Sequence, residues 1–128
     1  KQIPPFWQGI IESKHQILRR TRFNICYENM REIPGYVSEK IYDSAANGSI
    51  PIYIPSSDDN TDLVAKELYI DPRDFESLHS LRSYCLAIDN SEFVKWQRNL
   101  FDFCVERAGF LRAEKRADWL LSDFLGNC

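Results

Sequence analysis

The chain has 128 residues, of which 44% are hydrophobic and 27% are charged, and its formal net charge is −3 at pH 7. This length fits one compact domain, and the small negative charge creates no broad field for a polyanion, so nucleic acid is not an expected partner. No apolar run reaches the roughly 20 residues that a membrane helix needs, and the first residues lack signal-peptide architecture. We therefore expect a soluble chain. Its first ten residues begin with lysine and are apolar without clear periodicity, which suggests a fragment of a longer protein.

The first part of the chain predicts a helix, a strand and a second helix. Residues 13–20 (SKHQILRR) begin with a suitable N-cap serine and place Ile17 and Leu18 on one side of a short helix. Residues 23–27 (FNICY) form an apolar run bounded by polar residues, as in a buried strand. After a break at Pro34-Gly35, residues 36–46 have helical periodicity. The inward positions of this helix are Val37, Ile41, Ser44 and Ala45.

The next elements continue the alternation of strand and helix. Asn47-Gly48 supplies a left-handed helix stop, and residues 50–54 (IPIYI) read as the next strand, in which Pro51 lies near the start. The following elements are expected to be a polar loop over 56–60, a helical turn over 61–66, a short third strand over 68–70, and a helix over 75–88 that follows Asp71-Pro72. This order predicts an α/β fold with a short parallel sheet flanked by helices.

The pattern changes after residue 90, because apolar side chains recur at helical spacing and no strand signal returns. We expect a helical C-terminal part over 91–128, with one long amphipathic helix from Ser91 and a second over about 111–125. Its large aromatic residues are interpreted as core and helix packing. Residues 1–128 are thus interpreted as a single domain.

The cysteines carry no metal or redox motif. They are far apart in the sequence, without a CxxC pair or a histidine at ligand spacing: Cys26, Cys85, Cys104 and Cys128. Buried free thiols in a reducing compartment are the expected state, although two disulfide bridges remain open from sequence alone. His15 and His79 are interpreted as surface or cap residues, and Asp58-Asp59 as solvated loop acids.

The stretch RFNICYEN…PGYVSEKIYDSAANGSIPIYI resembles the donor-binding segment of the alpha-1,3-fucosyltransferases, glycosyltransferase family ten. That family typically shows a strand ending in F/Y-E-N, a G-Y-V-T-E-K helix start, a small-residue turn and an I-P-I-Y or V-P-V-Y strand. The resemblance extends over about residues 14–89, through LYIDPRDFESLHSLRSYCLAID. Several ordered motifs together are more specific than any one of them.

The resemblance implies the Rossmann-like C-terminal half of a GT-B glycosyltransferase. It implies a nucleotide-sugar-binding domain that takes GDP-fucose as donor substrate and needs no metal or other cofactor. Fucose would pass with inversion to a hydroxyl of a GlcNAc- or Glc-containing glycan acceptor. The general base would lie in an N-terminal acceptor domain, so no catalytic residue is expected in this chain, and the chain alone would be inactive.

Carried over position by position, the family's donor-contacting residues fall on Asn29, Tyr36, Glu39 and Lys40, with Ser38 in place of the family's threonine. A diphosphate leaving group needs cations and oriented N–H groups where its charge grows, and a helix start at a strand's carboxyl end supplies both. We expect this start at residues 36–38, with Lys40 against the phosphates. Asn29 would contact the nucleotide, and Glu39 would contact hydroxyls of ribose or fucose. The loop over 56–60 departs from the family's Trp-Gly, which leaves the identity of the donor open.

Other interpretations stay open at this point. Without the resemblance, the favoured interpretation of Glu39-Lys40 is a solvated pair, that of Ser38 is a simple N-cap, and that of Asn29 is a turn residue. The alternatives are a non-catalytic Rossmann-like interaction module, or a glycosyltransferase that uses another nucleotide sugar. We expect a bacterial cytoplasmic location with peripheral membrane association, because the cysteines suggest a reducing compartment and no anchor is visible.

Overall fold

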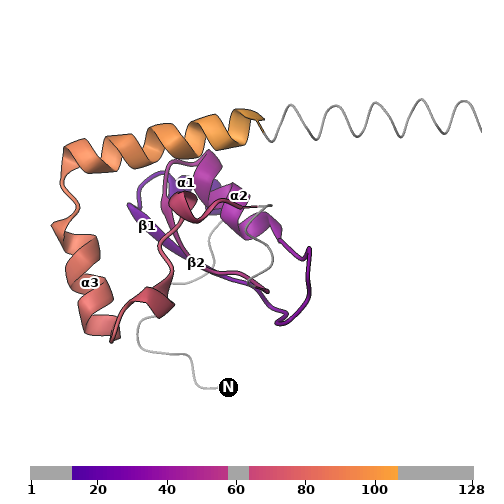
Figure 1. Ribbon diagram of the computed structural model, residues 1–128. Helices are drawn as coiled ribbons and strands as arrows, with labels where there is room; N and C mark the ends of the chain where they lie inside the picture. Colours follow the sequence, from indigo (N-terminus) through magenta and orange to yellow (C-terminus); the bar gives the residue numbers. More distant parts are fainter. Residues whose placement is uncertain (1–12, 58–63, 107–128) are drawn as a thin grey trace, which may run out of the picture.

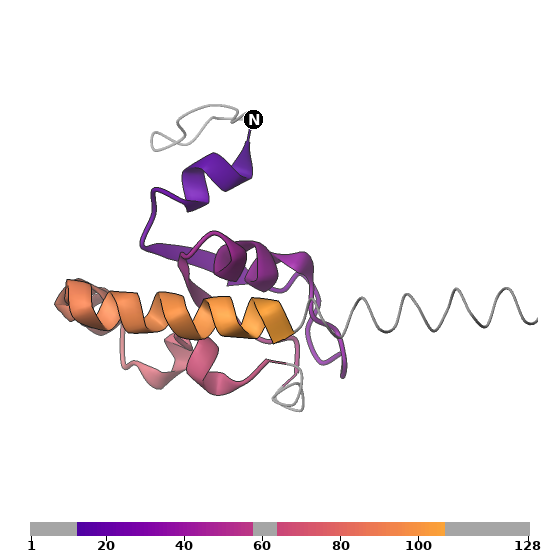
Figure 2. The same ribbon diagram turned by 90° about the horizontal axis from the view of Figure 1, so that it is seen from above.

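The structure is a computed structural model that describes residues 13–57 and 64–106. Its named elements are, in chain order, α1 (Lys14–Leu18), β1 (Phe23–Tyr27), α2 (Glu39–Ala46), β2 (Ile50–Ile54), η2 (Lys66–Leu68), η3 (Pro72–Asp74) and α3 (Leu78–Ala87). Residues 90–106 are also helical. Figure 1 shows α3 and this last helix along two adjoining sides of the strands, and Figure 2 shows α1 and the segment with η2 and η3 on opposite sides of them.

The sheet confirms the predicted parallel α/β arrangement. β1 and β2 pair in parallel, with Phe23 opposite Ile50 and Tyr27 opposite Ile54, and α2 connects them. Ile70 forms a parallel bridge to Ile52 on the other edge of β2. β2 therefore lies between β1 and the segment around Ile70, and the carboxyl ends of both strands meet at one edge of the sheet.

Several predicted boundaries need correction. The second helix begins at Glu39 rather than at residue 36, because the backbone of Ser38 is extended at φ −84° and ψ 172°. The third strand shrinks to the single bridge at Ile70, because Lys66–Leu68 forms a 3₁₀ turn. α3 begins at Leu78 instead of residue 75, because Ser77 caps it through a reciprocal pair of contacts with Ser80. Residues 61–63 of the predicted turn over 61–66, and the whole predicted helix over 111–125, lie outside the described residues.

The core lies around β2, on which Ile50 and Tyr53 are fully buried. The predicted inward positions Ile41, Ser44 and Ala45 of α2 are buried against it. The prediction that residues 23–27 form a buried strand is wrong as to burial, since only Cys26 is buried in β1 and Ile25 is 66% exposed. In α1, Leu18 is buried but Ile17 faces outward.

The helix over 90–106 is tied to the strands by polar and apolar contacts. Arg22, just before β1, donates from Nη2 to the carbonyl oxygen of Ile88 at 2.8 Å, and its guanidinium lies 4.6 Å from the ring centroid of Phe93. Gln97 donates to the carbonyl oxygen of Gly48 at 3.1 Å, and Leu100 is fully buried. This helix is therefore part of the same packed unit.

Candidate functional site

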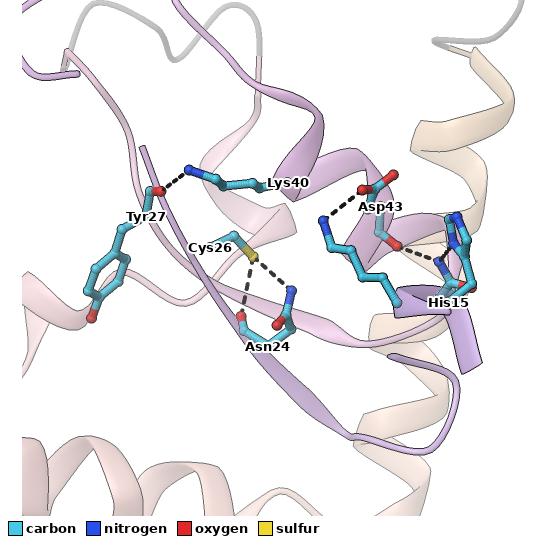
Figure 3. Close-up of polar contacts among 8 residues, drawn as sticks. His15, Asn24, Cys26, Tyr27, Lys40 and Asp43 are labelled. Atoms are coloured by element: carbon cyan, nitrogen blue, oxygen red, sulfur yellow. Dashed lines mark hydrogen bonds and ion pairs between the residues drawn. The ribbon is translucent and has the colours of Figure 1, made fainter. Parts of the chain in front are cut away.

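Two of the residues expected to bind the donor meet where β1 ends and α2 begins. Lys40, in the first turn of α2, donates from Nζ to the side-chain Oδ1 of Asn29 at 2.7 Å. The same ammonium group donates to the carbonyl oxygen of Tyr27, the last residue of β1, at 2.9 Å (Figure 3). The positively charged side chain of Lys40 is thus held at the carboxyl edge of the sheet. Lys40 and Asn29 meet there although they are 11 residues apart in the chain.

Glu28, which follows β1, connects the carboxyl edge of the sheet to the start of α2 and to β2. Its Oε1 accepts a hydrogen bond from the Ser38 backbone N–H at 2.9 Å and another from the Tyr53 hydroxyl at 2.8 Å. Burial, and then the Glu28 carboxylate, raise the pKa of Tyr53, which keeps its hydroxyl protonated as a donor. Sequence reasoning missed Glu28, although it is the middle residue of the Y-E-N triplet.

The remaining predicted residues lie at the start of α2 with different exposure. Ser38 is the N-cap residue, but its hydroxyl makes no cap hydrogen bond and is buried without a partner among the described residues. Tyr36 is half-buried, and its N–H donates to the carbonyl oxygen of Ile33 at 3.3 Å. Glu39 is exposed at the first position of the helix.

These contacts correct the expected position of the open N–H groups. We expected them at residues 36–38, but the N–H of Tyr36 is bound to Ile33 and that of Ser38 to Glu28. The first turn of an α-helix leaves its N–H groups without intrahelical partners, so the groups available to an anion lie at the first turn of α2 instead. This turn also carries Lys40.

A hollow of about 680 Å³ opens at the carboxyl end of β2. It is lined by Arg31, Glu32 and Pro34 from the loop after β1, by residues 54–57, and by Arg73 from η3. None of the five residues expected to bind the donor lines this hollow. Sequence reasoning also missed its charged residues, because their convergence depends on how two loops lie against each other.

The described cysteines are free, as expected from their spacing. Cys26 and Cys85 are buried and Cys104 is half-buried, and burial raises the pKa of each thiol. Residues 13–57 and 64–106 contain no group of three or more His, Cys, Asp or Glu side chains that could hold a metal ion. Within the same ranges, no helix combines the length and the apolar character required to cross a membrane.

His15 takes part in packing between α1 and α2. Its Nδ1 lies 2.9 Å from the side-chain nitrogen of Asn47 (Figure 3). Beside it, Lys14 forms an ion pair of 2.8 Å with Asp43. These contacts agree with the surface position expected for His15, and they place it at the opposite end of α2 from Lys40.

The parallel strands and their connecting helix place this chain among the open α/β proteins. Proteins of this class bind ligands at the carboxyl edge of the sheet, where the polar and charged side chains described above lie. Residues 8–115 match the model of glycosyltransferase family 10 (fucosyltransferase), C-terminal part, and the chain belongs to this family. It is 32% identical over 91 residues to the alpha-(1,3)-fucosyltransferase FucT of Helicobacter pylori, a match that covers 71% of this chain and 17% of that protein. The family prediction is thereby confirmed. No solved structure matches the chain.

Proposed function

We propose that this chain is the donor-binding domain of a fucosyltransferase that uses GDP-fucose with inversion. The observation that carries the proposal is the meeting of Lys40 and Asn29 at the carboxyl edge of the sheet, in a chain of this family. The fold supports it as well, since a strand leading into a helix start at that edge is a common phosphate-binding arrangement. A GlcNAc- or Glc-containing glycan is the proposed acceptor.

The chemistry follows from the charge that develops on the leaving diphosphate. When the bond between sugar and phosphate breaks, negative charge accumulates on the phosphate oxygens, and cations or N–H dipoles already oriented toward them stabilise it. Lys40 supplies the cation, and the first turn of α2 supplies the dipoles. Asn29 is assigned to the nucleotide and Glu39 to hydroxyl groups of ribose or fucose, and Tyr36 and Ser38 are assigned to the donor side of the helix start.

The acceptor side of the reaction is assigned to another part of the protein. The chain spans 17% of the length of its Helicobacter pylori relative. We place the acceptor site and the general base in an N-terminal domain that completes a GT-B enzyme. A bacterial cytoplasmic location near the membrane is also part of the proposal, and the free thiols at Cys26, Cys85 and Cys104 support its reducing compartment.

Thermal unfolding with added GDP tests the donor assignment. A ligand that binds only the folded state at 100 times its dissociation constant stabilises that state by about 2.7 kcal/mol, so GDP should raise Tm. Lys40→Ala should reduce the rise. Lys14→Ala is the matched control. Lys14 forms an ion pair with Asp43, which lies on α2 as Lys40 does but away from the proposed site. The donor assignment is wrong if millimolar GDP and GDP-fucose leave the melting curve of the folded protein unchanged.

A further inference from the structure

The hollow at the carboxyl end of β2 is built by a strained loop that is fastened to the end of the strand. Ser56, which is only 6% exposed, accepts a hydrogen bond at its carbonyl oxygen from the N–H of Glu32 at 2.6 Å. Its hydroxyl also accepts from the N–H of Ile33 and donates to the carbonyl oxygen of Ile33, both at 3.2 Å. Three hydrogen bonds to one buried serine therefore fix the loop backbone beside the hollow.

Glu32 adopts a backbone conformation that non-glycine residues rarely adopt. Its φ is +59°, and Glu32 is the only described non-glycine residue with a positive φ. A left-handed residue other than glycine costs about 1–2 kcal/mol, and residues strained in this way cluster at active sites, ligand clamps and switch regions. Here the bonds to Ser56 hold the strained residue in place, and both Arg31 and Glu32 line the hollow as a result.

The charged side chains that line the hollow differ in whether other residues of the described chain already bind them. Arg73 is engaged by Asp71, which its Nη2 contacts at 2.7 Å. The side chains of Arg31 and Glu32 make no hydrogen bond or ion pair within residues 13–57 and 64–106. One guanidinium and one carboxylate therefore line the hollow with their hydrogen-bonding capacity unused by the described chain.

This composition favours a neutral, hydroxyl-bearing ring over a phosphate. A carboxylate repels a phosphate, whereas a sugar hydroxyl can donate to a carboxylate and accept from a guanidinium at the same time. Pro34, Ile54 and Pro55 add apolar surface, against which the C–H face of a sugar ring can lie. The polar and apolar parts thus match the two kinds of surface that a pyranose presents.

We propose that Arg31 and Glu32 contact the sugar ring of the nucleotide sugar in this hollow and determine the preference for that sugar. The inference rests on the proposed function, because it assigns a place to the sugar of the same donor. It adds two residues to the site, neither of which was expected to bind the donor from the sequence. It also divides the site by chemistry: Lys40 and the first turn of α2 face the diphosphate, and Arg31 and Glu32 face the sugar.

Calorimetric titration of the complete gene product that contains this chain, without acceptor, tests the inference by comparing GDP with GDP-fucose. Arg31→Ala and Glu32→Gln should each weaken GDP-fucose binding about tenfold, as expected for losing one hydrogen bond to a charged group. GDP binding should stay within about twofold of the unsubstituted protein, because GDP lacks the sugar. Arg98→Ala and Glu76→Gln are matched controls, since both residues are exposed and neither lines the hollow.

Two results would overturn the inference. Equal weakening of GDP and GDP-fucose would move the two side chains to the nucleotide or the phosphates, and no weakening of either would leave them solvated. Failure of the unsubstituted protein to bind GDP is a different result, because it overturns the proposed function itself. Folding of the variants is checked by their unliganded Tm, which should not change, since neither side chain has a partner within the described residues.

Discussion

At the scale of single residues, Asp71 caps the 3₁₀ turn η3, which follows the bridge at Ile70. Its side chain is almost fully buried, and it accepts hydrogen bonds from the backbone N–H of Arg73 at 2.9 Å and from the Arg73 guanidinium at 2.7 Å. Burial alone would raise the pKa of this carboxyl, but the hydrogen bonds from Arg73 outweigh it and lower the pKa below its usual value. The ionised form is therefore favoured by folding.

The consequence is a stability term that depends on pH. A carboxyl whose pKa is lowered on folding stabilises the protein above its unfolded pKa of about 3.9, and this contribution is lost as pH falls through the lowered value. Asp71→Asn should reduce the free energy of unfolding by about 1–2 kcal/mol at pH 7. In urea unfolding, the difference between the two proteins should narrow below about pH 4. A difference that is absent at pH 7, or that is independent of pH, would contradict the assignment.

At the scale of elements, Glu28 is the junction between β1, α2 and β2. It accepts hydrogen bonds from the N–H of Ser38 at the start of α2 and from the hydroxyl of the fully buried Tyr53 in β2. Its neighbours on either side, Tyr27 and Asn29, both accept from Lys40. The Glu28 carboxylate therefore fixes the start of α2 relative to the end of β1. The side chain of Lys40, which is proposed to bind phosphate, spans these two places.

A double-mutant cycle measures this junction. Tyr53→Phe should cost about 1 kcal/mol, because one hydrogen bond is lost and Glu28 keeps its bond to Ser38. Glu28→Ala should cost about 2–4 kcal/mol, since two donors lose their acceptor. The double variant should be less destabilised than the sum of the two by about 1 kcal/mol, because the Tyr53 hydroxyl is then absent. Additive effects in urea unfolding would show that the two groups are not coupled.

The elements also show which features are readable from the sequence. Both strands were predicted with their observed bounds, because short apolar runs between polar residues describe a strand locally. The end of α2 was predicted as well, since Gly48 adopts the left-handed conformation at φ +73° that its position requires. The start of α2 was not, because Ser38 gives its N–H to Glu28 across the fold, and no local pattern announces that contact.

The candidate site divides in the same way. Asn29 and Lys40 could be named from an ordered motif, and the structure brings them together. Arg31 and Glu32 could not, because they reach the hollow only through the bonds between their loop and Ser56, which is 24 residues beyond Glu32. Contacts of this kind are set by tertiary packing, for which a single sequence carries no periodic signal.

At the scale of the whole molecule, the described unit combines a tightly packed centre with apolar side chains on its outside. Ile50 and Tyr53 are fully buried, whereas Ile25 on β1 is 66% exposed and Leu78 on α3 is 77% exposed. The burial of the helix over 90–106 shows the same contrast between adjacent residues: Leu100 is fully buried and Phe101 is 65% exposed. Leu100 therefore reports on the inner face of this helix, and Phe101 reports on its outer face.

This pair predicts how the last described helix contributes to stability. Leu100→Ala should lower the free energy of unfolding by about 2–5 kcal/mol, because it removes a buried side chain and leaves a cavity. Phe101→Ala should change it by about 0.5 kcal/mol or less, as is usual for surface substitutions. Urea unfolding of the two variants measures both values under the same conditions. A large cost at Phe101 would mean that this face is covered in solution, and a small cost at Leu100 would mean that the helix does not pack on the strands, so that the core would have to form without it.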